Sequence, residues 1–232
     1  MASATLNEAL ERSRVHGSRI SAADALCQLG VVYRLTGNYP AALSSLAGAL
    51  ERYRETEDRL GEADSFRNMG AVQHLTGDYK AALESLTQAL KLYRYLASRP
   101  GQADALRNLG IVQHLTQDYP SATSSLTQAL DLYRDVGDRH GEIEALNDLG
   151  DLMLDSFGVA KAHPHHESAR TTAKTINVPL EEARALEGLG RCDLAEGHTV
   201  QGGKYLRQAL AIYQEIGSPN DARVQAILQD LS

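Results

Sequence analysis

The chain has 232 residues, of which 43% are hydrophobic and 23% are charged, and its formal net charge is −7. This composition is that of a folded soluble protein, and the net negative charge disfavours direct binding to the phosphate backbone of DNA or RNA. No run approaches the ~18 consecutive apolar residues of a transmembrane helix, and residues 1–10 lack the basic and apolar segments of a signal peptide. We therefore expect a cytoplasmic protein that binds neither nucleic acid nor membrane. Cys27 and Cys192 belong to no CxxC pair, which favours free, buried thiols.

A repeat of 40 residues runs through the chain. Three markers recur with this period: a Leu-Gly or Met-Gly pair, an alanine, and a tyrosine that is replaced by Ala173 in the fourth repeat. The marker positions are Leu29-Gly30, Met69-Gly70, Leu109-Gly110, Leu149-Gly150 and Leu189-Gly190, then Ala9, Ala49, Ala89, Ala129, Ala169 and Ala209, and Tyr53, Tyr93, Tyr133 and Tyr213. A period of this length predicts an array of stacked repeats rather than one globular core.

Each repeat is predicted to be a pair of helices, for which the second repeat serves as the example. Its first helix is expected near residues 63–76 and its second near residues 79–96. Gly77 and Asp78 predict the turn between them, because glycine tolerates a positive φ and aspartate caps the following helix. Since glycine costs about 1 kcal/mol inside a helix, the repeated Leu-Gly glycine indicates a helix crossing that a side chain would block.

The array is out of phase with the start of the chain. Residues 1–18 align with a second helix that lacks its first, so the chain is either a piece of a longer protein, which we favour, or begins with a degenerate cap. Repeats then follow over 20–57, 60–97, 100–137, 140–177 and 179–217, and a capping helix is predicted at 220–231. We expect twelve helices in a single domain over 1–232.

The fourth repeat is irregular, because His166 stands where other repeats have leucine. Its second helix is expected to be thinly packed and the softest of the array. His163, His166 and Glu167 share one helical face and could supply two or three zinc ligands. We favour the other interpretation, in which Pro164 begins a helix, His163 and His165 are solvated and His166 packs, and we predict no metal site.

These residues together resemble the tetratricopeptide repeat family, whose signature matches Leu-Gly followed by Tyr33, Gly37, Tyr39, Ala42, Leu46 and Ala49. The resemblance implies an all-α, right-handed superhelical solenoid of about five helix-turn-helix repeats between a leading helix and a capping helix. Repeats of the family usually have about 34 residues, and we expect the additional residues, such as 58–62 and 138–142, to lengthen the second helix and its exit. The longer form is similar to the C-terminal arrays of Streptomyces antibiotic regulatory protein type regulators and to spindle-orienting scaffold proteins.

The resemblance also implies a peptide site on the concave face, which the first helices line. The predicted peptide-binding residues are Asp64, Arg67, Asn68 and His74 of the second repeat and Asp104, Arg107, Asn108 and His114 of the third. Asparagine offers both a donor and an acceptor to a peptide backbone, and arginine offers forked donors to a carboxylate. We expect all of the Arg and Asn side chains to be exposed. The alternative is that they are solvated positions copied when a repeat duplicated, since residues 72–76 recur as 112–116.

A further periodic row holds arginines near the ends of second helices. The row is Arg19, Arg59, Arg99 and Arg139, with Arg14, Arg54, Arg94 and Arg134 one turn earlier, and these arginines are expected to form surface salt bridges with nearby acidic residues such as Asp58, Glu62, Asp138 and Glu142. No catalytic constellation and no phosphate-cradling loop is present, so we predict no enzyme activity and no cofactor.

The sequence therefore favours a scaffold that binds a protein or peptide partner, as the sensor arm of a bacterial transcription regulator would. Two alternatives stay open. One is a structural scaffold that self-associates through its N-terminal end, and the other is a metal- or small-molecule-responsive switch at residues 163–167.

Overall fold

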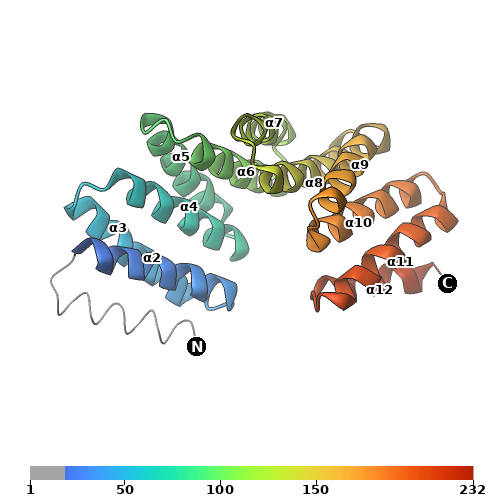
Figure 1. Ribbon diagram of the computed structural model, residues 1–232, viewed down its shortest axis with the longest axis horizontal. Helices are drawn as coiled ribbons and strands as arrows, with labels where there is room; N and C mark the ends of the chain where they lie inside the picture. The colour runs from blue at the N-terminus through green and yellow to red at the C-terminus, as the bar shows by residue number, and fades with distance from the viewer. Residues whose placement is uncertain (1–18, 232) are drawn as a thin grey trace. The chain divides into compact units, whose positions relative to one another are not determined.

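The computed structural model describes residues 19–231, and every regular element in that range is a helix (Figure 1). Eleven helices are described, labelled from α2 as in Figure 1, which confirms the expected all-α array of helix pairs. They are α2 (Arg19–Leu35), α3 (Tyr39–Glu55), α4 (Arg59–Leu75), α5 (Tyr79–Tyr95), α6 (Arg99–Leu115), α7 (Tyr119–Val136), α8 (Arg139–Ser156), α9 (Val159–Thr175), α10 (Pro179–Ala195), α11 (Thr199–Glu215) and α12 (Asn220–Asp230). The leading helix predicted for 1–18 lies outside the described residues.

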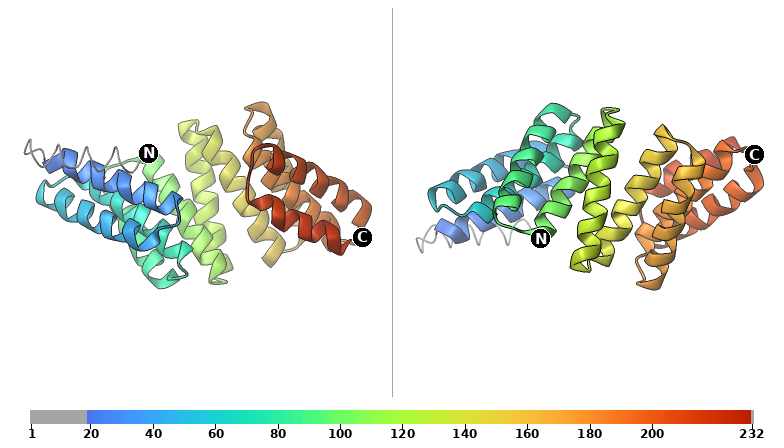
Figure 2. Two further views of the ribbon diagram at one scale, coloured as in Figure 1. Left: turned by 90° about the horizontal axis from the view of Figure 1, so that it is seen from below. Right: turned by 90° about the horizontal axis from the view of Figure 1, so that it is seen from above.

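The chain forms two compact units, one over Met1–Asp118 and one over Tyr119–Ser232. In the first unit α2 to α6 pack in chain order, and in the second α7 to α12 do the same (Figure 2). The first helices of successive repeats also touch one another, α2 with α4, α4 with α6, and α8 with α10. Each unit thus presents a row of adjacent first helices.

The turn inside the second repeat is the one that the sequence predicts. Gly77 has a φ of +79°, a left-handed conformation that glycine adopts without strain. The Asp78 side chain then caps α5 by accepting a hydrogen bond from the backbone N–H of Ala81 at 3.1 Å.

The glycine of the Leu-Gly pair lies at a close helix crossing, as expected. A Cβ on Gly30 would come within 2.5 Å of Leu46 Cγ, and one on Gly70 would come within 2.5 Å of Leu86 Cγ. The leucines are fully buried, so they cannot move aside without loss of packing. The same crossing recurs between Gly190 and Leu206 in the second unit.

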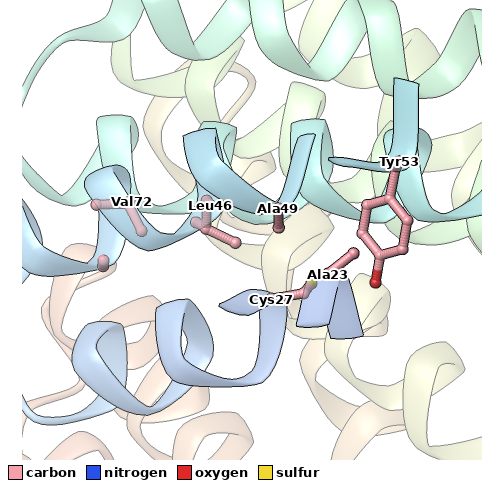
Figure 3. Close-up of a cluster of buried hydrophobic side chains, with 7 residues drawn as sticks. Ala23, Cys27, Leu46, Ala49, Tyr53 and Val72 are labelled. Atoms are coloured by element: carbon pink, nitrogen blue, oxygen red, sulfur yellow. The ribbon is translucent and has the colours of Figure 1, made fainter. Parts of the chain in front are cut away.

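The core of the first repeat shows how small residues permit this approach. Leu46, Ala49 and Tyr53 project from α3 toward Ala23 and Cys27 of α2 (Figure 3). Both alanines are fully buried. Small side chains at these positions let the two helices pack closely.

The additional residues of each repeat lie elsewhere than predicted. Residues 58–62 do not extend the second helix: Asp58 is the N-cap of α4, and residues 59–62 form its first turn. The physical reason is that Asp58 accepts hydrogen bonds from the N–H groups of Leu60 and Gly61, while the Tyr53 ring lies against Gly61. The first helix therefore begins four residues earlier than expected.

The fourth repeat keeps its second helix but starts it differently. α9 begins at Val159 after Gly158, and Pro164 lies inside the helix, so the prediction that Pro164 begins it is wrong. Its buried residues are Ala162, His166, Ala169 and Ala173, a thin stripe for a 17-residue helix.

The predicted capping helix is present as α12. Val224 is fully buried against α10 and α11, with Ile227 and Leu228 packed around it. None of the described helices is both long and apolar enough to cross a lipid bilayer.

Candidate functional site

The predicted peptide-binding residues lie on two first helices of the first unit. Asp64, Arg67, Asn68 and His74 are on α4, and Asp104, Arg107, Asn108 and His114 are on α6. The two helices are neighbours, and Arg67 Nη1 of α4 lies 4.0 Å from Asp104 Oδ2 of α6. We call these eight side chains of α4 and α6, together with the neighbouring side chains of α2, the first-helix row.

The two asparagines are less accessible than predicted. Asn68 is only 6% exposed and Asn108 is half-buried, so the expectation that both are exposed is wrong. Each asparagine donates its Nδ2 hydrogen bond to its own helix, Asn68 to the Asp64 carbonyl and Asn108 to the Asp104 carbonyl, both at 2.9 Å. Asparagine readily bonds the carbonyl one turn back, and α2 covers Asn68, whose Nδ2 lies 3.9 Å from Cys27 Sγ.

Arg67 is held in place by its own unit rather than free in solvent. Its side chain is 27% exposed, and its Nε donates to the Tyr93 hydroxyl at 3.3 Å. The Tyr93 hydroxyl in turn donates to Asp64. Burial alone would lower the pKa of Arg67, but Tyr93 and Asp104 outweigh it and raise the pKa. The expectation of an exposed Arg67 is therefore wrong, and its guanidinium is oriented by α5. Arg107 is also half-buried, which contradicts its expected exposure.

Arg34 of α2 extends the row, and the sequence prediction missed it. Arg34 occupies the same repeat position as His74 and His114, so alignment of the repeats could have identified it. Its Nε is buried and has no hydrogen-bond partner within residues 19–231. Burial, and then the charge of Arg67, lower the pKa of Arg34. The pKa of His74 is lowered as well, first by burial and in part by Arg34.

The arginines near the helix ends pair as predicted with glutamates but not with aspartates. Glu62 lies 2.8 Å from Arg59 and 3.8 Å from Arg54, and Glu142 lies 2.8 Å from Arg139 and 3.0 Å from Arg134. Asp58 and Asp138 instead cap α4 and α8. Two of the four pairs, Arg54–Glu62 and Arg134–Glu142, join consecutive repeats, and each glutamate is shared by two arginines.

The histidine cluster is a packing feature. His166 is 1% exposed, and its ring lies between α8 and α10 where a Cβ on Gly150 or Gly188 would collide with it. Neither ring nitrogen has a hydrogen-bond partner in the described chain. Burial, followed by the charges of Arg191 and Arg184, lowers the pKa of His166 to about 3.

The other two histidines of the cluster, His163 and His165, are half-buried rather than solvated. Between residues 19 and 231, no three His, Cys, Asp or Glu side chains are placed to hold a metal ion.

Comparison with known proteins agrees with this architecture. The model of the tetratricopeptide repeat family matches residues 21–94 and 101–175. No curated protein matches the chain.

Several solved structures share the fold. BtubC from P. vanneervenii is 17% identical with a TM-score of 0.79, and the alignment covers 93% of this chain and 91% of that one. A signal transduction ATPase with numerous domains (STAND) from Pyrococcus horikoshii, which has a tetratricopeptide repeat sensor, is 15% identical with a TM-score of 0.77 over 96% of this chain and 35% of that one. The Rap conjugation gene regulator of plasmid pLS20, in complex with the Phr* peptide, is 13% identical with a TM-score of 0.73 over 90% of this chain and 56% of that one.

Proposed function

This chain belongs to the tetratricopeptide repeat family, and we propose that it is a protein-interaction scaffold whose first-helix row binds an acidic segment of a partner. Stacked helix pairs of this kind offer extended surfaces rather than enclosed, water-free sites. A surface of that type suits a peptide or a partner domain.

The observation that carries the proposal is the unpartnered Nε of Arg34 next to Arg67. A buried N–H without an acceptor costs about 1–3 kcal/mol, and two nearby guanidinium groups repel each other. A carboxylate placed between them would accept hydrogen bonds from both and remove the repulsion. The positive charge of Arg34 also acts on His74, whose pKa it helps burial to lower.

The asparagines would contribute differently from what the family resemblance implies. One amide N–H of each side chain is already bonded, to the Asp64 or to the Asp104 carbonyl. The half-buried Asn108 would offer its side-chain oxygen to a ligand N–H. Arg34 and Arg67 supply the charge in this arrangement, and Asn108 contributes orientation.

Two structural relatives support a regulatory setting. One is a conjugation gene regulator solved with a peptide, and the other carries its repeats as a sensor. Together with the similarity to Streptomyces antibiotic regulatory protein type regulators, they favour the sensor arm of a bacterial transcription regulator as the role of this chain.

The proposal is tested with fluorescein-labelled peptide pools that are Glu-rich, Lys-rich or neutral, titrated against the protein by fluorescence anisotropy. We expect saturable binding of the Glu-rich pool alone, weakening as salt is added. Arg34→Gln should reduce affinity at least tenfold. Arg94→Gln, which removes an exposed arginine of α5, is the matched control and should leave affinity unchanged.

Equal affinity of the Arg34→Gln and Arg94→Gln proteins would contradict the proposal. Native mass spectrometry of the same samples distinguishes the alternative of a self-associating scaffold, because a mass of two chains without peptide would favour it. The N-terminal end to which that alternative was assigned lies outside residues 19–231.

A further inference from the structure

The first helices of the first unit carry aliphatic side chains at two repeat positions near their C-terminal ends. The two positions are four residues apart, so they share one face of each helix. Because α2 contacts α4 and α4 contacts α6, the repeat places these positions next to one another on adjacent helices. We call the six side chains the aliphatic patch: Val31 and Leu35 of α2, Ala71 and Leu75 of α4, and Ile111 and Leu115 of α6.

The three leucines of the patch are open to solvent. Leu35 is 70% exposed, Leu75 is 44% exposed and Leu115 is 47% exposed, and each is the last residue of its helix. The other three patch residues are half-buried. Single exposed leucines are common on protein surfaces, whereas apolar side chains gathered on one surface mark a contact with another molecule.

The fold itself does not require aliphatic side chains at these positions. In the second unit the same positions hold Asp151 and Asp155 of α8 and Arg191 and Ala195 of α10. Arg191 pairs there with Asp151 at 2.7 Å and with Asp155 at 3.4 Å. Packing of the repeats thus tolerates charge at these positions, and the aliphatic patch is a property of the surface of the first unit.

The patch borders the cationic part of the first-helix row. Arg34 directly precedes Leu35 and follows Val31 by three positions, so it lies along the edge of the patch on α2. Its Nε is buried and has no hydrogen-bond partner in the described part of the chain. Burial lowers the pKa of Arg34, and the nearby charge of Arg67 lowers it further. A ligand whose carboxylate reaches Arg34 therefore also meets the patch.

We propose that the acidic segment bound by the first-helix row also carries aliphatic side chains, which pack on the aliphatic patch while its carboxylates bind Arg34 and Arg67. This inference rests on the proposed function and narrows the partner to an acidic segment rich in aliphatic residues. Such contacts remove water from around the patch, and a charge-assisted hydrogen bond is stronger where water is excluded. A segment that is only acidic would leave the leucines in water.

A lipid bilayer is a less suitable occupant of the same surface. Anionic headgroups beside acyl chains also combine negative charge with apolar groups. A bilayer is flat, however, and the Arg34 Nε is buried, so a single side chain on a slender segment reaches it more readily than a lipid surface does.

Three fluorescein-labelled peptide pools of equal length test the proposal by fluorescence anisotropy. The first combines Glu with Leu, the second combines Glu with Ser, and the third combines Gln with Leu. We expect the Glu/Leu pool to bind at least tenfold more tightly than either of the others, because it alone satisfies both the arginines and the patch. Added salt should weaken binding of the Glu/Leu pool toward that of the Gln/Leu pool.

Two variants locate the aliphatic contact. Leu75→Ser should reduce the ratio of the affinities for the Glu/Leu and Glu/Ser pools at least fivefold. Leu96→Ser is the matched control, because Leu96 is an exposed leucine that follows α5 and lies outside the patch, and it should leave that ratio unchanged. If Leu75→Ser fails to fold, Leu35→Ser replaces it, since Leu35 is the most exposed residue of the patch.

Equal affinity for the Glu/Leu and Glu/Ser pools, with both weakened by Arg34→Gln, would overturn this inference and leave the proposed function standing. Failure of all three pools to bind would contradict both. The inference is also overturned if Leu96→Ser lowers the ratio as much as Leu75→Ser does, or if vesicles that contain phosphatidylserine bind more tightly than the Glu/Leu pool. A dimer that Leu75→Ser dissociates would overturn it in favour of a second copy of the chain as the occupant.

Discussion

The ring of Tyr93 lies directly over Gly101, where any side chain would collide with its Cδ1 and Cε1 atoms. Tyr53 covers Gly61 and Tyr133 covers Gly141 in the same way. In the fourth repeat the tyrosine is replaced by Ala173, and the residue at the glycine position is Glu181, whose carboxylate is buried and bonded to Asn147 at 2.9 Å. Tyrosine and glycine therefore form a unit that joins one repeat to the next after the first, second and third repeats, whereas Tyr213 of the fifth repeat is followed by Asp221 at the glycine position.

Gly101→Ala tests this unit. The added methyl group must displace the nearly fully buried Tyr93 ring, so we expect a loss of about 1–3 kcal/mol in the free energy of unfolding. Gly48→Ala is the control, because it lies inside α3 where a Cβ meets nothing closer than 3.4 Å. It should stabilise the protein by up to about 1 kcal/mol. Urea unfolding followed by circular dichroism measures both, and a Gly101→Ala protein as stable as the parent would contradict the pairing.

The turns between repeats allow a second prediction about stability, in which substitutions at two equivalent turns have opposite effects. Ala97 has a φ of +52° and is exposed, whereas Gly137 occupies the corresponding turn of the next repeat with a φ of +75°. A left-handed residue with a Cβ costs about 1–2 kcal/mol. Replacing Ala97 with glycine removes this cost. Glycine also gives the unfolded chain more conformational freedom, which offsets part of the resulting gain in stability.

We therefore expect Ala97→Gly to raise the free energy of unfolding by about 0.5–1 kcal/mol. Gly137→Ala should lower it by a similar amount, since no atom crowds that site and strain alone is tested. Thermal unfolding of the two variants should thus shift in opposite directions. Shifts of the same sign would show that the φ values do not govern stability at these turns.

The sequence predicted the parts of the fold that depend on residues near each other in the chain. Gly77 and Asp78 predicted the turn, Gly70 predicted the helix crossing, and the stripe through Val224 predicted the last helix. The first turn of α4 was missed although its N-cap, Asp58, is a local signal, because the turn contains Gly61, against which the Tyr53 ring of the preceding helix packs. A single domain over 1–232 and the absence of enzyme activity stay predictions.

The candidate site was predicted less well, for a related reason. The repeat register placed Arg67 and Arg107 on one row, but their exposure depends on helices that pack beside them. Asn68 is buried by α2, and Arg67 is held by Tyr93 of α5. The aliphatic patch was not predicted, because apolar residues at helical spacing are first assigned to the core.

The thin packing of α9 predicts that it opens more readily than α11, a helix of the same length. Gly158 provides no side-chain cap, Pro164 removes one backbone hydrogen bond, and the buried stripe has three alanines. We expect the amides of α9 to exchange with deuterium at least tenfold faster than those of α11, measured by mass spectrometry of peptic peptides. Equal protection of the two helices would show that α8 and α10 hold α9 firmly in spite of its sequence.

His166→Leu should stabilise the protein, and the gain should grow as the pH falls. Leucine fills the corresponding position in α3, α5 and α11, and it removes two buried ring nitrogens without partners, worth about 1–3 kcal/mol. The pKa of His166 is lowered from 6.5 to about 3 in the folded protein, so below pH 6.5 the unfolded chain binds a proton that the folded one does not. Native stability is therefore lost as the pH falls from 6.5 toward 3, by about 1.4 kcal/mol for each pH unit. The carboxylates titrate alike in both proteins, so their effect cancels in the difference between the variant and the parent. Urea unfolding at pH 7.0, 5.5 and 4.5 should show that difference increasing by about 2–3 kcal/mol across the series. A difference that does not change with pH would mean that His166 reaches a proton acceptor or solvent when it becomes charged.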